Sequence, residues 1–211
     1  MSERYFFILF LTSYFISSLK NLKNDRKRLN KNSLIILFNC TFKQIFFNLF
    51  FVFPLFIAFP KMIGISIYRE KLYFPLFLLE IIFNYYFQDF LHYHIHILIH
   101  KNKFLKILHK KRHFLHQVAG FTSYYCNPID FILLDLIPTY FGLFAIKAHI
   151  YTYFFYIITE TYLTVLYRSG MGKRSAFFDF HNKYLVSNFG TDLFMDKYKE
   201  TYYIFDKNNF I

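Results

Sequence analysis

Long runs of apolar residues constrain the fold of this chain more than any other feature. The run Leu72–Leu91 has about the length that a helix needs to cross the hydrocarbon core of a bilayer, and Leu34–Pro60 is longer still. Ile129–Tyr167 is long enough for two crossings or for a hairpin that enters and returns, with Pro138 and Gly142 as candidate break points. The runs predict several membrane-spanning helices.

The composition agrees with this prediction. Apolar residues make up 55% of the 211 residues and aromatic residues 25%, whereas charged residues make up only 18%. We therefore expect an all-α, multi-span helical membrane protein. Tyr5–Leu19 is short for a span and is compatible with a signal anchor, an interfacial helix or a tilted span, and Pro54 is expected to kink Leu34–Pro60.

The formal net charge of +12 comes from basic stretches beside the apolar runs. Because basic loops favour the cytoplasmic side of a membrane, we expect Lys20–Lys31, Lys101–Arg112 and the C-terminal segment to lie there. This arrangement explains the charge better than nucleic-acid binding, which we exclude. Cys40 and Cys126 follow neither a metal-binding nor a disulfide pattern.

The histidines are concentrated in the stretch Asp89–His116, which holds seven of the nine in the chain. Residues four apart share one face of a helix, so two stripes of imidazoles are expected there. The first stripe contains His92, His96 and His100, and the second contains His109, His113 and His116. Two facing helices with such stripes can enclose a metal ion. The alternative is a basic, aromatic interfacial segment that faces lipid headgroups.

Six landmarks between residues 72 and 201 occur in the order found in one known family. Asp89 precedes the H-x-x-x-H pair His96 and His100, and H-K-K-R-H follows at residues 109–113. The later landmarks are N-P-I-D at 127–130, R-S-G-M at 168–171, F-D-F-H-N with N-F-G at 178–190, and Asp196 with Thr201. This series resembles the histidine boxes of the fatty acid hydroxylase and sterol desaturase superfamily.

The resemblance implies a four-span-like membrane enzyme with a cytoplasmic histidine-rich cap. It would divide the chain into N-terminal membrane segments and a basic loop (1–71), a fatty acid hydroxylase-like domain (72–201) and a tail (202–211). The family uses two non-haem metal ions, usually iron, with O2 and electrons from a cytochrome b5-type or reductase partner, to hydroxylate or desaturate lipids. In a eukaryote, we expect the endoplasmic reticulum membrane.

The residue-by-residue match implies metal ligands but no further catalytic side chain. Five histidines keep family ligand positions: His96, His100, His109, His113 and His181. His92 and His116 extend the two stripes and are expected to supplement these five, and Asp179 and Asp196 are candidate carboxylate ligands. We expect the five to converge at the end of the Leu72–Leu91 span.

Four family histidines are replaced, by Arg112, Arg168, Phe178 and Asn182. Arginine is permanently charged and has no lone pair for a metal. Because Lys110 and Lys111 make its turn basic, we expect Arg112 to point outward to solvent or headgroups.

Three functions remain open: an O2-dependent sterol or fatty acyl lipid oxidoreductase, a catalytically degenerate member that acts as a lipid-binding or scaffold protein, and an unrelated membrane metal-binding protein. Metal content separates the first two.

Overall fold

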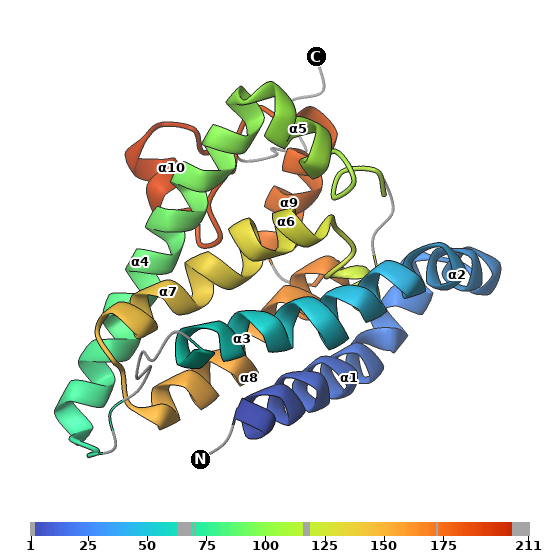
Figure 1. The fold of residues 1–211 in the computed structure, drawn as a ribbon. Coiled ribbons are helices and arrows are strands. Elements are labelled where there is room, and N and C mark those ends of the chain that lie inside the picture. Colours follow the sequence, from blue (N-terminus) through green and yellow to red (C-terminus); the bar gives the residue numbers. More distant parts are fainter. Residues whose placement is uncertain (1–2, 63–68, 70, 116–118, 172, 204–211) are drawn as a thin grey trace.

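The computed structural model describes residues 3–62, 69, 71–115, 119–171 and 173–203 (Figure 1). Within these ranges the chain forms helices and connecting loops without a β-strand, which confirms the predicted all-α class. The helices are α1 (Glu3–Arg28), α2 (Lys31–Phe47), η1 (Asn48–Val52), α3 (Phe53–Met62), α4 (Phe74–Lys101), α5 (Lys103–His109), η2 (Gly120–Thr122), α6 (Pro128–Asp130), η3 (Phe131–Leu136), α7 (Ile137–Ala145), α8 (Ile150–Arg168), α9 (Lys173–Tyr184) and α10 (Phe194–Tyr198).

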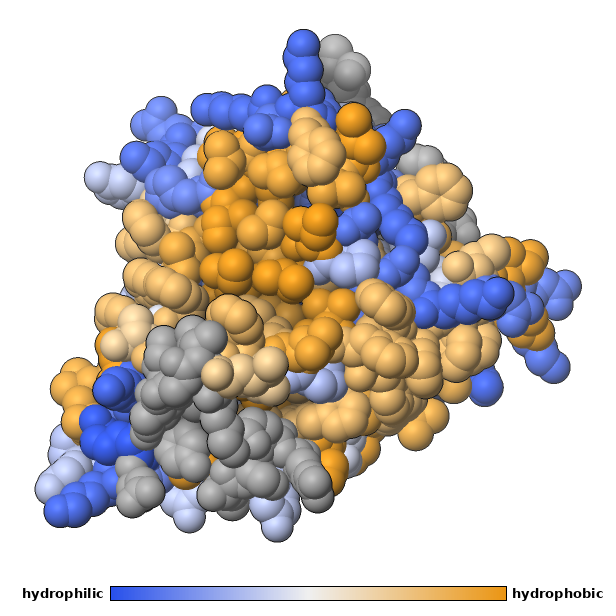
Figure 2. Space-filling view, viewed as in Figure 1, coloured by the Kyte–Doolittle hydropathy of each residue, from blue (hydrophilic) through white to orange (hydrophobic). Residues whose placement is uncertain are grey.

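Three helical stretches are long and apolar enough to cross a membrane: Tyr5–Lys27, Lys31–Pro60 and Pro128–Ala145. The short run Tyr5–Leu19 therefore belongs to one longer helix that continues into the basic stretch. Many large apolar side chains of these helices are exposed, among them Phe15, Phe42 and Phe51. Figure 2 shows apolar side chains over the middle of one face and hydrophilic ones at its upper end, where α5 lies. These features identify a membrane protein.

Two of these three stretches, Lys31–Pro60 and Pro128–Ala145, contain a π-helical segment just before a proline. The segment η1 comes before Pro54, and η3 comes before Pro138. Proline has no N–H to donate and its ring crowds the preceding turn, so a widened turn accommodates it without ending the helix. The expected kink at Pro54 is thus a π-helical distortion in a helical stretch that runs from Lys31 to Met62.

The break predicted at Pro138 or Gly142 is wrong, because the chain turns between α7 and α8 at residues 146–149, with Lys147 in the left-handed region. Gly142 instead lets α7 approach α4. A Cβ atom there would lie 2.4 Å from the Asn84 Oδ1 and 2.7 Å from the ring of Phe87. The close approach fixes α4 against α7, and α1 packs along α8 (Figure 1).

The helix α4 carries a row of polar side chains on one face, each four residues after the last. The row consists of Glu80, Asn84, Gln88, His92, His96 and His100. All are buried except His100, which is half-buried. These polar groups explain why α4, which contains the expected span Leu72–Leu91, is not among the three most apolar stretches. The row leads along α4 to the end where α5, α9 and α10 gather (Figure 1).

Candidate metal centre

Five imidazoles converge where α4 ends, and they come from three parts of the chain. His96 and His100 lie on the last turns of α4, His109 ends α5, His113 follows in the next turn, and His181 lies on α9. Asn102 produces the reversal between α4 and α5, because its side chain accepts a hydrogen bond from the Leu105 N–H and caps the second helix. The short α5 therefore folds His109 back onto α4.

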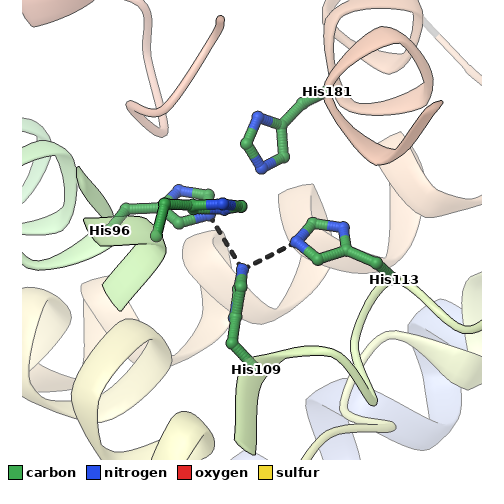
Figure 3. Close-up of side chains that lie close together, drawn as sticks. His96, His109, His113 and His181 are labelled. Atoms are coloured by element: carbon green, nitrogen blue, oxygen red, sulfur yellow. Dashed lines mark hydrogen bonds between the residues drawn. The ribbon is translucent and has the colours of Figure 1, made fainter. Parts of the chain in front are cut away.

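One nitrogen atom from each of these five rings lies within 4.8 Å of the others. The His109 Nε2 lies 3.1 Å from the His96 Nε2 and 2.7 Å from the His113 Nε2 (Figure 3). The Nε2 atoms of His100 and His181 are buried without a hydrogen-bond partner. The predicted convergence of the five family positions is thus present in the structure.

The outer nitrogens of four rings each face an oxygen that accepts a hydrogen bond. The Nδ1–H of His96 donates to the Phe189 carbonyl at 2.8 Å, and that of His181 donates to the Ser187 carbonyl at 2.6 Å. The His109 Nδ1–H donates to the Asp130 Oδ1 at 2.7 Å, and the His113 Nδ1–H donates to the Asn182 Oδ1 at 3.0 Å. With Nδ1 protonated in this way, each Nε2 keeps its lone pair.

The resulting arrangement is suited to a cation. Lone pairs that face each other across about 3 Å repel, and a metal ion between them turns this repulsion into coordination. Burial, followed by the neighbouring imidazoles, lowers the pKa values of His100 and His113, and burial likewise lowers the pKa of His181. His100, His113 and His181 are therefore neutral near pH 7, and neutral imidazole suits zinc, copper, iron or nickel.

A loop between α9 and α10 supplies the carbonyl that orients the α4 histidines. The Asp196 carboxylate accepts hydrogen bonds from the N–H groups of Phe189 and Gly190, at 2.8 and 2.6 Å. Asp89 accepts from the N–H groups of Asp192 and Met195, at 2.7 and 2.8 Å. A Cβ atom on Gly190 would lie 2.6 Å from the Asp89 carboxylate, so only glycine fits between these two acids. Asp196 therefore anchors the loop, and the structure does not support its expected role as a ligand.

Two other candidate ligands, His92 and Asp179, lie outside the five-ring group. His92 is buried and its Nδ1–H also donates to the Phe189 carbonyl, at 2.8 Å, but it is not a member of the group. Asp179 is exposed on α9 and is not a member either. His116 lies outside the described residues, so its expected role stays a prediction.

The outward orientation expected for Arg112 is wrong. Its side chain is only 9% exposed, and its guanidinium donates to Asp130 at 2.7 Å and to Asp135 at 2.5 and 3.3 Å. The carboxylates of Asp130, which is buried, and Asp135, which is half-buried, outweigh the attraction of the basic turn, because a charge removed from water needs a counter-charge nearby. Arg168 is equally buried, and its guanidinium lies 5.6 Å from the centre of the Phe178 ring.

A cavity of about 90 Å³ adjoins the histidine group. Its polar walls include Gln88, Glu160 and the two arginines, and its apolar walls include Tyr124 and Tyr140. The Gln88 amide donates to the Glu160 carboxylate at 2.9 Å within this wall. The site therefore combines a ring of imidazoles with a small, mixed cavity beside it.

The sequence did not predict the roles of three groups that orient the histidines: Asp130, Asn182 and the Phe189 carbonyl. Asp130 closes the N-P-I-D landmark, so its place in the family order was a usable signal. Asn182 was recognised only as the loss of a histidine, whereas it accepts the hydrogen bond of His113. Every residue has a backbone carbonyl, so the residue type at position 189 could not indicate this role.

The fold and the site define a helical membrane protein with a buried histidine cluster at one end of its helices. Two proteins of Dictyostelium discoideum named "Putative methylsterol monooxygenase" are 27% and 25% identical to the chain, each over 90% of this chain and 76% of the relative. "Fatty acid hydroxylase domain-containing protein 2" of Macaca fascicularis is 30% identical over 67% of this chain but only 41% of its own length. No family model and no solved structure matches the chain.

The chain belongs to the fatty acid hydroxylase and sterol desaturase superfamily, as these relatives and the ordered histidine landmarks indicate.

Proposed function

We propose that the protein is a membrane-bound, non-haem iron oxidoreductase that uses O2 to oxidise C–H bonds of a lipid. The observation that carries the proposal is the group of five imidazoles, in which one nitrogen atom of each ring lies within 4.8 Å of the others. Bound iron would supply the activation of O2, for which a redox metal with open coordination positions is needed. His96, His100, His109, His113 and His181 would hold it.

The surroundings of the histidine group support a lipid substrate. The group lies at the end of helices whose outer faces are apolar, and the adjoining cavity has apolar side chains such as Leu136 and Tyr140 in its wall. Sterol is the favoured class, because two relatives carry the name methylsterol monooxygenase. A fatty acyl substrate is the alternative that the other relative's name suggests.

The partners and location follow from the same proposal. Electrons would come from a separate cytochrome b5-type protein or reductase. The basic turn at Lys110 and Lys111 would lie on the cytoplasmic side, since basic residues prefer that side. In a eukaryotic cell the membrane would be that of the endoplasmic reticulum.

The test compares two histidines on the same helix. His96 belongs to the group, whereas His94 is exposed and its Nδ1–H bonds to the Phe90 carbonyl. We expect membranes with the full chain to give O2-dependent oxidised sterols or acyl lipids by mass spectrometry, and the purified protein to contain iron. His96→Ala should abolish both, and His94→Ala should leave both unchanged.

A protein that folds but holds no metal, and whose membranes contain no new oxidised lipid, would contradict the proposal. That result would favour the degenerate lipid-binding member, whose specific support is the replacement of family histidines by Arg112 and Arg168.

A further inference from the structure

The size of the histidine group indicates how many ions it can hold. A metal–imidazole bond of about 2.1 Å places ligands on opposite sides of one ion about 4.2 Å apart. Two ions about 3.5–4 Å apart, each with its own outer ligands, would spread the nitrogens over about 8 Å. The five nitrogens here lie within 4.8 Å of one another, which is close to the span of one ion's ligands and well short of the span that two ions need.

The part of the chain that the structure describes contains no second group of this kind. His92, the nearest additional imidazole on α4, stands apart from the five although it shares the Phe189 carbonyl with His96. Asn182 occupies a family histidine position but serves the first group, because its oxygen accepts from His113. Among the described residues, neither of these two side chains therefore supplies a second set of ligands.

Fixed positive charge lies beside the group instead. Asp130 accepts from His109 through one oxygen and from Arg112 through the other, both at 2.7 Å. The Arg112 guanidinium is thus separated from a ligand by a single carboxylate. Arg112 also engages Asp135, and Arg168 lines the same cavity. A guanidinium cannot lose its proton in a protein and has no lone pair, so it repels a cation and cannot bind one.

We infer that this centre holds one metal ion, and that Arg112 and Arg168 take the adjoining position that a second ion would otherwise need. The inference rests on the metal binding in the proposed function. It assigns the five histidines to a single ion and gives Asp130 and Asp135 to the guanidinium rather than to a metal. The two arginines are then structural replacements for a second cation.

The test is the metal content of the purified full-length protein after anaerobic loading with Fe(II). We expect about one iron per chain in the unmodified protein and in Arg112→Lys, which keeps the positive charge. Arg112→His removes that charge and adds an imidazole, so it should raise the content towards two. Loading with Mn(II) should give the paramagnetic resonance pattern of an isolated ion rather than of a coupled pair.

Two irons per chain, or a coupled manganese pair, in the unmodified protein would overturn the single-ion inference and leave the proposed function intact. A folded protein without metal would overturn the proposed function as well. If Arg112→His fails to fold, the iron content and the Mn(II) resonance pattern of the unmodified protein still test the single-ion inference.

Discussion

Two neighbouring polar clusters near the end of α4 satisfy their buried groups in opposite ways. In the histidine group, five imidazoles converge, and the buried Nε2 atoms of His100 and His181 have no hydrogen-bond partner. In the arginine cluster, made of Arg112, Asp130, Asp135 and Arg168, the Arg112 guanidinium is held by two carboxylates. The comparison teaches that the first cluster could take up a cation, whereas the second contains its own counter-charges. Asp130 links the two clusters, because it bonds to His109 in the first and to Arg112 in the second.

Replacing the shared residue should have the largest effect. Asp130→Ala leaves His109 without the acceptor that orients its ring and removes one of the two partners of Arg112. We expect a loss of about 3–5 kcal/mol in unfolding free energy, as for other broken buried ion pairs. Metal affinity should fall about 100-fold, the upper end for an outer-shell partner. Thermal unfolding and chelator competition measure the two effects.

The control for this prediction is Asp179→Ala, which removes an exposed carboxylate of α9. Equal losses in the two variants would show that Asp130 has no special position between the clusters.

Removing the metal should destabilise the histidine group and leave the arginine cluster intact. A ligand present at about 100 times its dissociation constant stabilises the folded state by about 2.7 kcal/mol. A chelator should therefore lower the melting temperature by roughly 5–10 °C for a chain of this size. His94→Ala should respond like the unmodified protein, and His96→Ala should not respond. A melting temperature that ignores the chelator would mean that no bound metal supports the fold.

A smaller effect is expected from the acceptor of His113. Asn182→Ala removes the oxygen that orients this one ring, at 3.0 Å, without touching a charge. Metal affinity should fall about tenfold, the lower end for such partners. Asn182→Asp keeps an acceptor at the same position and should retain most of the affinity in the same competition experiment.

The smallest effect on the metal is expected from Asp135→Asn. Asp135 bonds to Arg112, and Arg112 keeps Asp130 in this variant, so the orientation of His109 is preserved. Metal affinity should not change measurably, although the melting temperature should fall. A loss of affinity as large as that of Asp130→Ala would show that the two clusters act as one unit.

The sequence predicted the ligand group better than its surroundings, for a physical reason. His96 and His100 are four residues apart in α4, and helical geometry alone places them on one face. His109 ends α5 and His113 lies in the turn after it, so the prediction that this second pair shares a helix is wrong, although the four-residue spacing still identified both residues. The orientation of Arg112 depended on Asp130 and Asp135, which lie 18 and 23 residues further along the chain. Only the packed fold brings those carboxylates to the guanidinium, so the basic neighbours Lys110 and Lys111 gave the wrong indication.

In the membrane helices, too, the local sequence predicted one feature well and missed another that depends on packing. Long apolar runs identified the helical class because composition alone decides it. The position of the turn at residues 146–149 depended on how α7 packs on α4, which local signals at Pro138 and Gly142 do not report.

The Phe189 carbonyl and the His181 ring lie near the end of the chain, so they join the histidine group late in synthesis. Ribosomes build a chain from its N-terminus, so α1 to α8 and four of the five imidazoles exist before α9 and the loop that follows it. Until this last segment is synthesised, His96 lacks the carbonyl that orients it, and the histidine group lacks its fifth imidazole. A premature stop codon after α8 would thus yield a protein that has its membrane helices but cannot complete its metal site.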